Sequence, residues 1–307
     1  MAFVANMSGT TELDSSIVLA FEQSFLVANG QNNVMDQLAQ VNTSIGAKSI
    51  QMTKYARLAL ATTPLTEYDE VARQTMSDTA ILFTPAEYGT VVTRTNLASL
   101  QTGGKADLAA AQVVGINAGS TMDKLAVNAL SAGSTIYAGA GTEAGLVAGD
   151  VMDAAFLNKM YNKLARSNVP MINGAYVAVL HDDQIHDLRS STGVGSWVDV
   201  NKYSDPSTVL ANEVGFFKGF KIIRNNNINF ADQAGAGLVD AYSGLFLGFN
   251  ALGKAESQAM SVRITGPFDA LGRFVNVGWY TVAQYGIVDP EAVYVGVTSS
   301  SVGNNAA

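Results

Sequence analysis

Apolar residues recur at helical spacing over residues 96–132, the longest such pattern in the chain. Intervals of three and four separate its apolar or small positions: Leu108, Ala111, Gly115, Ala118, Met122, Leu125, Ala126 and Ala129. Gly115 and Gly119 weaken the middle, because glycine costs up to about 1 kcal/mol inside a helix. The pattern predicts a long helix that either breaks near Gly119 or packs closely against another backbone.

The first 48 residues predict an N-terminal arm. Ile17, Phe21 and Phe25 recur every four residues, and a second short helical stretch is expected over 34–41. The arm has one apolar stripe and no evident core of its own. We therefore expect it to gain stability by lying on a neighbouring molecule.

Residues 49–85 predict an extended hairpin. Segments rich in Thr, Tyr, Val and Ile at 50–61 and 80–95 flank a polar stretch at 62–78. An isolated two-stranded hairpin is only marginally stable in water. This one must fold onto the core of its own chain or lie across a neighbour.

The rest of the chain is expected to form short helices and strands that are segregated rather than alternating. Helices are predicted over 151–166 and from a cap at Asp182 and Asp183 to Arg189. Strands are predicted at 175–180, 221–224, 245–249, 261–265, 273–285 and 293–298. This arrangement predicts the α+β class. The small polar residues from Ser299 onward predict a frayed tail.

Composition excludes several classes of protein. The sequence has no cysteine, which rules out disulfide scaffolds, zinc–thiolate sites and thiol nucleophiles. No apolar run reaches the roughly 20 residues of a membrane-spanning helix. The first basic residue is Lys48, so the sequence predicts neither a secretory signal nor a basic nucleic-acid-binding arm at its start.

Charged residues make up 14% of the 307 residues, and the net charge is -8. An ordinary soluble domain has about 25% charged residues. One explanation is an Ala/Gly-rich fold with a weakly polar surface. The sharper explanation is that other subunits cover much of the surface, because obligate interfaces are depleted of charge.

Candidate catalytic chemistry is sparse. His181 and His186 are the only histidines, no G-x-S-x-G motif presents a serine, and a spacing of five puts the two rings on different faces of a helix. The glycines between 139 and 145 lack the final spacing of a dinucleotide loop. The sequence therefore predicts no enzyme, no cofactor and no metal site.

The predicted hairpin carries the charges that we expect to contact a neighbouring subunit. Exposed ion pairs are worth only about 0.2–1 kcal/mol, so they set the geometry of a contact more than its affinity. The predicted contact residues are Lys54, Arg57, Glu67, Asp69, Glu70 and Arg73.

The order of these parts resembles the major capsid proteins of tailed bacteriophages, which have the Hong Kong 97-like fold. Four stretches resemble the coat-protein family typified by that of phage N-four. They are PAEYG at 85–89, AYVAVLHDDQIHDLR at 175–189, NEVGFFKGFKII at 212–223, and VGWY at 277–280 with Tyr285-Gly286. None of these stretches is catalytic, so the likeness rests on their order and spacing.

The resemblance implies an arm at 1–48, an extended hairpin loop at 49–85, a peripheral domain at 86–132 and 260–299, an axial domain at 133–259 and a flexible tail at 300–307. It implies a structural subunit that forms hexamers and pentamers of an icosahedral head around double-stranded DNA. Such a chain would be located in the virion after assembly in the host cytoplasm, away from membranes. Scaffolding, portal and decoration proteins are the expected partners, with DNA touched non-specifically on the inner face.

Two alternatives remain open from the sequence. The first is an encapsulin-like bacterial nanocompartment shell, which has the same fold and encloses an enzyme in place of a genome. The second is a soluble hydrolase that uses His186 with an unrecognised nucleophile.

Overall fold

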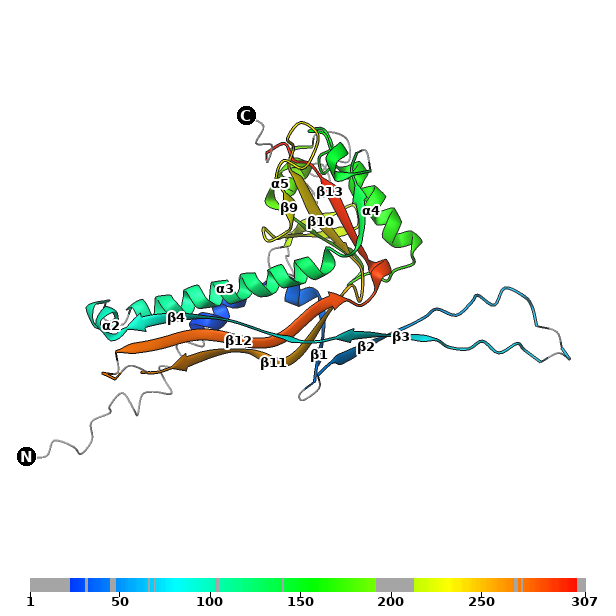
Figure 1. Ribbon diagram of the computed structural model, residues 1–307. Helices are drawn as coiled ribbons and strands as arrows, with labels where there is room; N and C mark the ends of the chain where they lie inside the picture. Colours follow the sequence, from blue (N-terminus) through cyan, green and yellow to red (C-terminus); the bar gives the residue numbers. More distant parts are fainter. Residues whose placement is uncertain are drawn as a thin grey trace, which may run out of the picture.

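The computed structural model of the chain describes residues 23–30, 33–44, 48–65, 67–68, 70–102, 105–139, 141–191, 213–267, 270–271 and 273–302. Two sheets lie at an angle, and a long helix runs beside the lower one (Figure 1). The chain therefore combines segregated helices and strands, and the predicted α+β class is confirmed.

The lower sheet is long and has four strands in the order β1-β11-β12-β4. Their bounds are β1 Ala39–Thr43, β11 Leu252–Thr265, β12 Phe274–Ile287 and β4 Ala86–Thr95. β1 pairs parallel with β11, and the other two pairings are antiparallel. β1 and β4 are therefore the edges of this sheet.

The upper sheet has seven strands, in the order β5-β13-β10-β6-β8-β7 with β9 beside β10. Their bounds are β5 Ser134–Tyr137, β6 Tyr176–Leu180, β7 Glu213–Phe217, β8 Phe220–Arg224, β9 Phe230–Ala231, β10 Ala241–Leu247 and β13 Val293–Thr298. The helices and short 3-10 turns beside it are η2 Glu143–Gly145, α4 Ala154–Arg166, α5 Asp182–Ser190 and η3 Pro290–Ala292. Phe156 of α4 meets Phe246 of β10 edge-on, at 6.3 Å between ring centroids, inside the main core.

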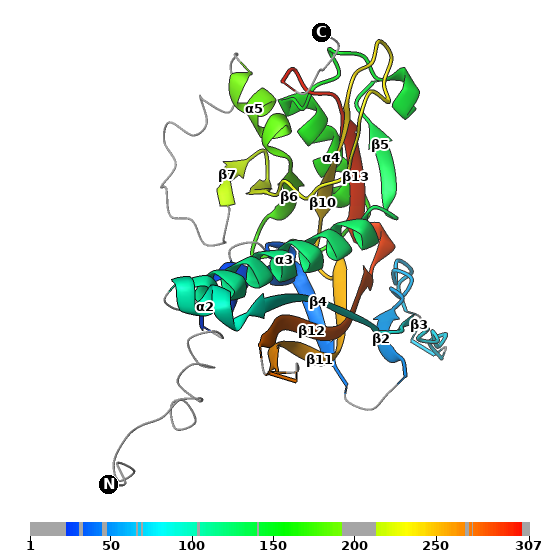
Figure 2. The same ribbon diagram turned by 60° about the vertical axis from the view of Figure 1, so that its left-hand side comes forward.

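The long helix α3 (Lys105–Leu130) follows the short helix α2 (Asn96–Thr102) and lies along the lower sheet (Figure 2). It continues unbroken through Gly119, so the expected break near that residue is wrong. The prediction of close packing is confirmed at Gly115, where an added Cβ would lie 2.8 Å from the carbonyl oxygen of Phe25. A glycine is required at this position despite its low helix propensity, because the backbone of the helical segment 23–30 lies too close for a side chain.

The described part of the N-terminal arm rests on its own chain, which corrects the expectation that the arm has nothing of its own to pack against. Phe25 and Met35 are buried in the main core. Between residues 33 and 44, only η1 (Met35–Leu38) is helical, and Ala39–Thr43 form strand β1 instead of the predicted helix over 34–41. Ile17 and Phe21 lie outside the described residues.

A buried carboxylate joins the arm to the rest of the molecule. Asp123 of α3 is fully buried, and its Oδ1 accepts hydrogen bonds from the backbone N–H groups of Val34 and Met35, both at 3.1 Å. Its Oδ2 accepts from the side-chain amides of Asn225 (2.7 Å) and Asn227 (2.9 Å). One side chain therefore connects the arm, the long helix and the turn that follows β8.

The predicted hairpin exists, but its paired part is shorter than expected. β2 (Ile50–Tyr55) pairs antiparallel with β3 (Asp78–Phe83), and the ladder ends at Tyr55 and Asp78. The predicted strand at 80–95 is two strands, because β3 belongs to the hairpin and β4 to the lower sheet. The hairpin projects away from the body of the molecule (Figure 1).

Two further expectations are corrected near the C-terminus. β13 pairs with β10 and β5, so residues 293–298 are part of the upper sheet. They had been assigned to the predicted peripheral domain at 86–132 and 260–299. The chain is also anchored beyond Thr298, because Ser300 is buried and the backbone N–H of Ser301 donates to Asp187 at 3.1 Å. The predicted flexible tail is wrong for 300–302, and 303–307 lie outside the described residues.

We expect Asp123→Ala to lower the free energy of unfolding by more than about 2 kcal/mol, since each buried donor left without a partner costs about 1–3 kcal/mol. Urea unfolding of the unassembled chain measures this change. Asn128→Ala, at an exposed position of the same helix, is the matched control and should change little. Equal stability of the two variants would show that the hydrogen bonds of Asp123 do not hold the arm.

Candidate subunit interface

The root of the hairpin packs on a flat part of its own chain. Ile50, Met52 and Phe83 form a small core with Ala255 and Val288. A pair of glycines that face each other across β11 and β12 provides the floor: an added Cβ at Gly253 would lie 2.7 Å from the sulfur of Met52, and one at Gly286 would overlap the ring of Phe83. The hairpin therefore starts from a fixed base.

Two of the predicted contact residues fix the direction of the hairpin from within the same chain. Lys54 Nζ lies 2.6 Å from Asp289 Oδ1, and both side chains are partly buried. The Arg57 guanidinium donates to the carbonyl oxygens of Ser167 (3.2 Å) and Asn168, just beyond the C-terminus of α4. A cation at that end of a helix is favoured by the helix dipole. Lys54 and Arg57 are thus occupied at the root.

The other predicted contact residues lie toward the tip. Glu70 and Arg73 form an ion pair at 2.5 Å while both side chains stay more than three-quarters exposed. Glu67 is exposed, and Asp69 lies outside the described residues. The structure therefore separates the six predicted residues into a root pair and a tip group.

The apolar side chains of the distal hairpin are contact candidates that were not predicted from the sequence. Leu60 is 87% exposed and Tyr68 is 91% exposed, values far above those of side chains that pack in a folded core. The other exposed apolar residues of the hairpin are Tyr55, Leu58, Leu65, Val71, Met76 and Leu82. Their signal in the sequence is the pair Leu58 and Leu60 at the end of the first predicted strand. Apolar residues also interrupt the predicted polar stretch at 62–78, where a solvated loop would carry polar residues: Leu65, Tyr68, Val71 and Met76.

A second group of exposed apolar side chains lies at the other end of the lower layer. Leu97 and Leu100 of α2 and Val113 and Ile116 of α3 are all exposed. Figure 1 places α2 at the opposite end of the molecule from the hairpin tip. One molecule thus presents different apolar surfaces at its two ends.

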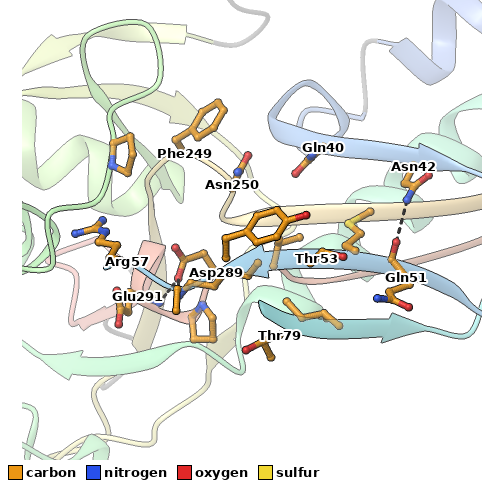
Figure 3. A pocket seen from close by; sticks show the side chains of 18 of the residues that line it. Gln40, Asn42, Gln51, Thr53, Arg57, Thr79, Phe249, Asn250, Asp289 and Glu291 are labelled. Atoms are coloured by element: carbon orange, nitrogen blue, oxygen red, sulfur yellow. Dashed lines mark hydrogen bonds and ion pairs between the residues drawn. The ribbon is translucent and has the colours of Figure 1, made fainter. Parts of the chain in front are cut away.

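A groove of about 910 Å³ lies between β1 and β2 at the hairpin root (Figure 3). Gln40 and Asn42 of β1 face Gln51 and Thr53 of β2 across it, and Asn42 Nδ2 donates to the carbonyl of Gln51 at 3.2 Å where the strands converge. Its rim also includes Val41, Tyr55 and Phe249, which are each about half exposed or more. The groove is open and partly apolar.

A polar network fixes β1 beside the groove. Lys254 Nζ, almost fully buried, lies 3.0 Å from Asp36 Oδ2, and the Tyr285 hydroxyl donates to Asp36 Oδ1 at 2.5 Å. Burial, followed by the nearby Asp36 carboxylate, raises the pKa of Tyr285 far above its usual value. The phenol therefore stays protonated and keeps donating its hydrogen bond even at a pH at which a free tyrosine would ionise.

The histidines have structural contacts. His181 caps α5, with Nδ1 accepting from the backbone N–H of Asp183 at 3.2 Å, so the cap is His181 and not Asp182 or Asp183 as predicted. His186 Nδ1 lies 3.7 Å from Asp187, and the Ser301 hydroxyl bonds directly to Asp187. In this order the carboxylate, not the imidazole, contacts the serine, which is not the arrangement that activates a nucleophile.

Within the described residues, no group of three or more His, Asp or Glu side chains is placed to hold a metal ion. No helix among them is long and apolar enough to cross a membrane. The features that remain are the projecting hairpin, its exposed apolar residues and the groove at its root.

Solved structures have a similar fold over most of the chain. The capsid of Ralstonia phage GP4 matches with a TM-score of 0.71 and 16% identity, covering 86% of this chain and 87% of that chain. The cyanophage Pam1 capsid asymmetric unit matches with a TM-score of 0.68 and 13% identity, covering 89% and 93%. The chain has the fold of phage capsid proteins.

The same capsid fold is present in the virus-like particle from Pyrococcus furiosus, with a TM-score of 0.57, 14% identity, and coverage of 90% of this chain and 98% of that chain. No protein-family model and no curated protein matches the sequence. The predicted Hong Kong 97-like fold is therefore confirmed by three-dimensional likeness, at sequence identities too low for pairwise sequence matching.

We expect Lys54→Met to loosen the hairpin root of this capsid-fold chain without unfolding the body. Partly exposed ion pairs contribute only about 0.2–1 kcal/mol, so global stability should change little, while the amides of β2 should exchange with deuterium several times faster. Lys48→Met, an exposed lysine just before the same strand, is the control. Unchanged exchange in β2 would show that the pair with Asp289 does not hold the hairpin.

Proposed function

We propose that this chain is the major capsid protein of a tailed bacteriophage, a structural subunit that assembles into hexamers and pentamers of an icosahedral head around double-stranded DNA. The observation that carries the proposal is a hairpin rich in exposed apolar residues, projecting from a body with a capsid fold. Isolated hairpins are marginal in water, so such a segment gains stability by packing on another molecule.

The two ends of the molecule support assembly into closed rings. The apolar residues of the hairpin and those of α2 and α3 are different surfaces on opposite ends. Contacts between unlike surfaces are heterologous, and they form a ring when the rotation between copies closes. Large contacts of this kind also account for a surface with few charges.

The charge of the chain favours enclosure of DNA over tight binding to it. The net charge is -8, and strong binding to phosphates requires basic patches. We therefore propose non-specific contact with packaged DNA on the inner face, a location in the virion after assembly in the host cytoplasm, and partners that include scaffolding, portal and decoration proteins.

Electron microscopy of the purified full chain, expressed alone and with its neighbouring reading frames, tests the proposal. We expect particles of regular size that contain DNA when the packaging genes are present. Particles filled with a cargo enzyme would favour the nanocompartment shell. A chain that stays a dispersed monomer in every combination would contradict any shell function and reopen the hydrolase alternative.

We expect the double charge reversal Glu70→Lys with Arg73→Glu to lower particle yield severalfold and to leave the unfolding midpoint of the unassembled chain unchanged. The variant keeps an internal ion pair, so it changes only the charge pattern offered to a neighbour. Glu70→Asp with Arg73→Lys preserves that pattern and serves as the control. Unchanged particle counts by electron microscopy would show that the charges at the hairpin tip do not contribute to the contact between subunits.

A further inference from the structure

The groove between β1 and β2 is lined by the free edges of two strands. Among the strands of the described residues, β1 is the end strand of the lower sheet and pairs with β11 alone, while β2 pairs with β3 alone. The lining includes residues 40–42 of β1, 51–55 of β2 and the next two residues, 56 and 57. Thr79 and Ile81 of β3 also line it, so the groove runs along the edges of β1 and β2 and continues over one face of the hairpin. Unpaired edges offer backbone N–H and C=O groups to an added strand.

The distal hairpin contains a segment that suits such a site. Beyond the end of the β2–β3 ladder, the sequence Leu58-Ala59-Leu60-Ala61 is uncharged and belongs to no strand. The Ala59 carbonyl accepts from the side-chain amide of Gln74 and the Leu60 carbonyl from the backbone N–H of Thr62, both at 3.1 Å, and a strand pairing would replace these local hydrogen bonds. Leu58 and Leu60 are exposed at alternate positions, and the alanines between them leave the opposite face small. In an extended chain, one face of this segment would therefore carry the two leucines, and the small alanines on the other face would let another backbone or sheet pack close to it.

We propose that residues 58–61 of one copy add as a strand to the β1–β2 groove of a second copy. This inference rests on the proposed shell function and specifies the contact that the hairpin makes there. Val41, Tyr55 and Phe249 at the rim would cover the two leucines.

The backbone favours this groove over the other exposed apolar surface. Burying an extended segment removes water from its N–H and C=O groups, which then need partners. The outer faces of α2 and α3 offer apolar side chains but no free backbone groups along their length, because a helix satisfies its own. The part of β2 that lines the groove, residues 51–55, is about 16 Å long at roughly 3.3 Å per residue, enough to pair with four or five residues.

The natural absence of cysteine makes disulfide crosslinking a clean test. Val41→Cys with Leu60→Cys places one thiol at the groove and one on the incoming segment. Both positions are exposed, so the exchanges should leave the fold intact. After mild oxidation of assembled particles, we expect denaturing gels without reductant to show linked copies beyond the monomer, and reductant to return them to monomer.

Leu60→Cys with Phe230→Cys, an exposed apolar position on β9 away from the groove, is the matched control and should stay monomeric on the gel. The inference is overturned if intact particles of the Val41–Leu60 variant give no linked copies, or if Leu60→Cys links instead to Val113→Cys of α3. Intact particles in either case leave the proposed function standing. If the parent chain formed no particles under any condition, that result would instead contradict the proposed function.

Discussion

A single buried carboxylate, that of Asp123, constrains how the three parts of the body meet. Burying a charge is costly unless hydrogen-bond donors surround it. Here the donors on one side are the backbone N–H groups of Val34 and Met35 in the arm, and those on the other are the side-chain amides of Asn225 and Asn227 after β8. Both pairs are roughly a hundred residues from Asp123 in the sequence. The long helix, the arm and the upper sheet must therefore close around this group together.

Contacts within the chain hold only part of the hairpin and its surroundings in place. The arm from Phe25 onward and the hairpin root are both fixed to their own chain, the first by Asp123 and the second by the glycine floor on β11 and β12. Beyond the end of the β2–β3 ladder, the described residues of the hairpin belong to no buried core and to no strand. The boundary between a stable body and a segment that depends on a partner lies within the hairpin, close to Tyr55 and Asp78.

The polar residues that are typical of enzymes are used here for structure. His181 caps a helix, Asp187 anchors the chain after β13, and Gln184, fully buried, donates to the Tyr242 carbonyl and the Thr298 hydroxyl. Burial and a hydrogen bond to Asp183 raise the pKa of Tyr242, which keeps that phenol neutral as well. These groups hold strands and helices in place, which agrees with a chain whose surface serves contacts with other copies.

The class of fold, the long helix, most strands and the existence of a charged hairpin were predictable from the sequence, because they depend on local periodicity and turn residues. The sparse charge that points to covered surfaces was visible there too. Three features were not predictable in this way: the strand at residues 39–43, the contacts of Lys54 and Arg57 with their own chain, and the groove between two strand edges. Each of these depends on partners far away in the chain, such as β11, Asp289 and the end of α4, and local spacing carries no information about which distant segment will lie alongside.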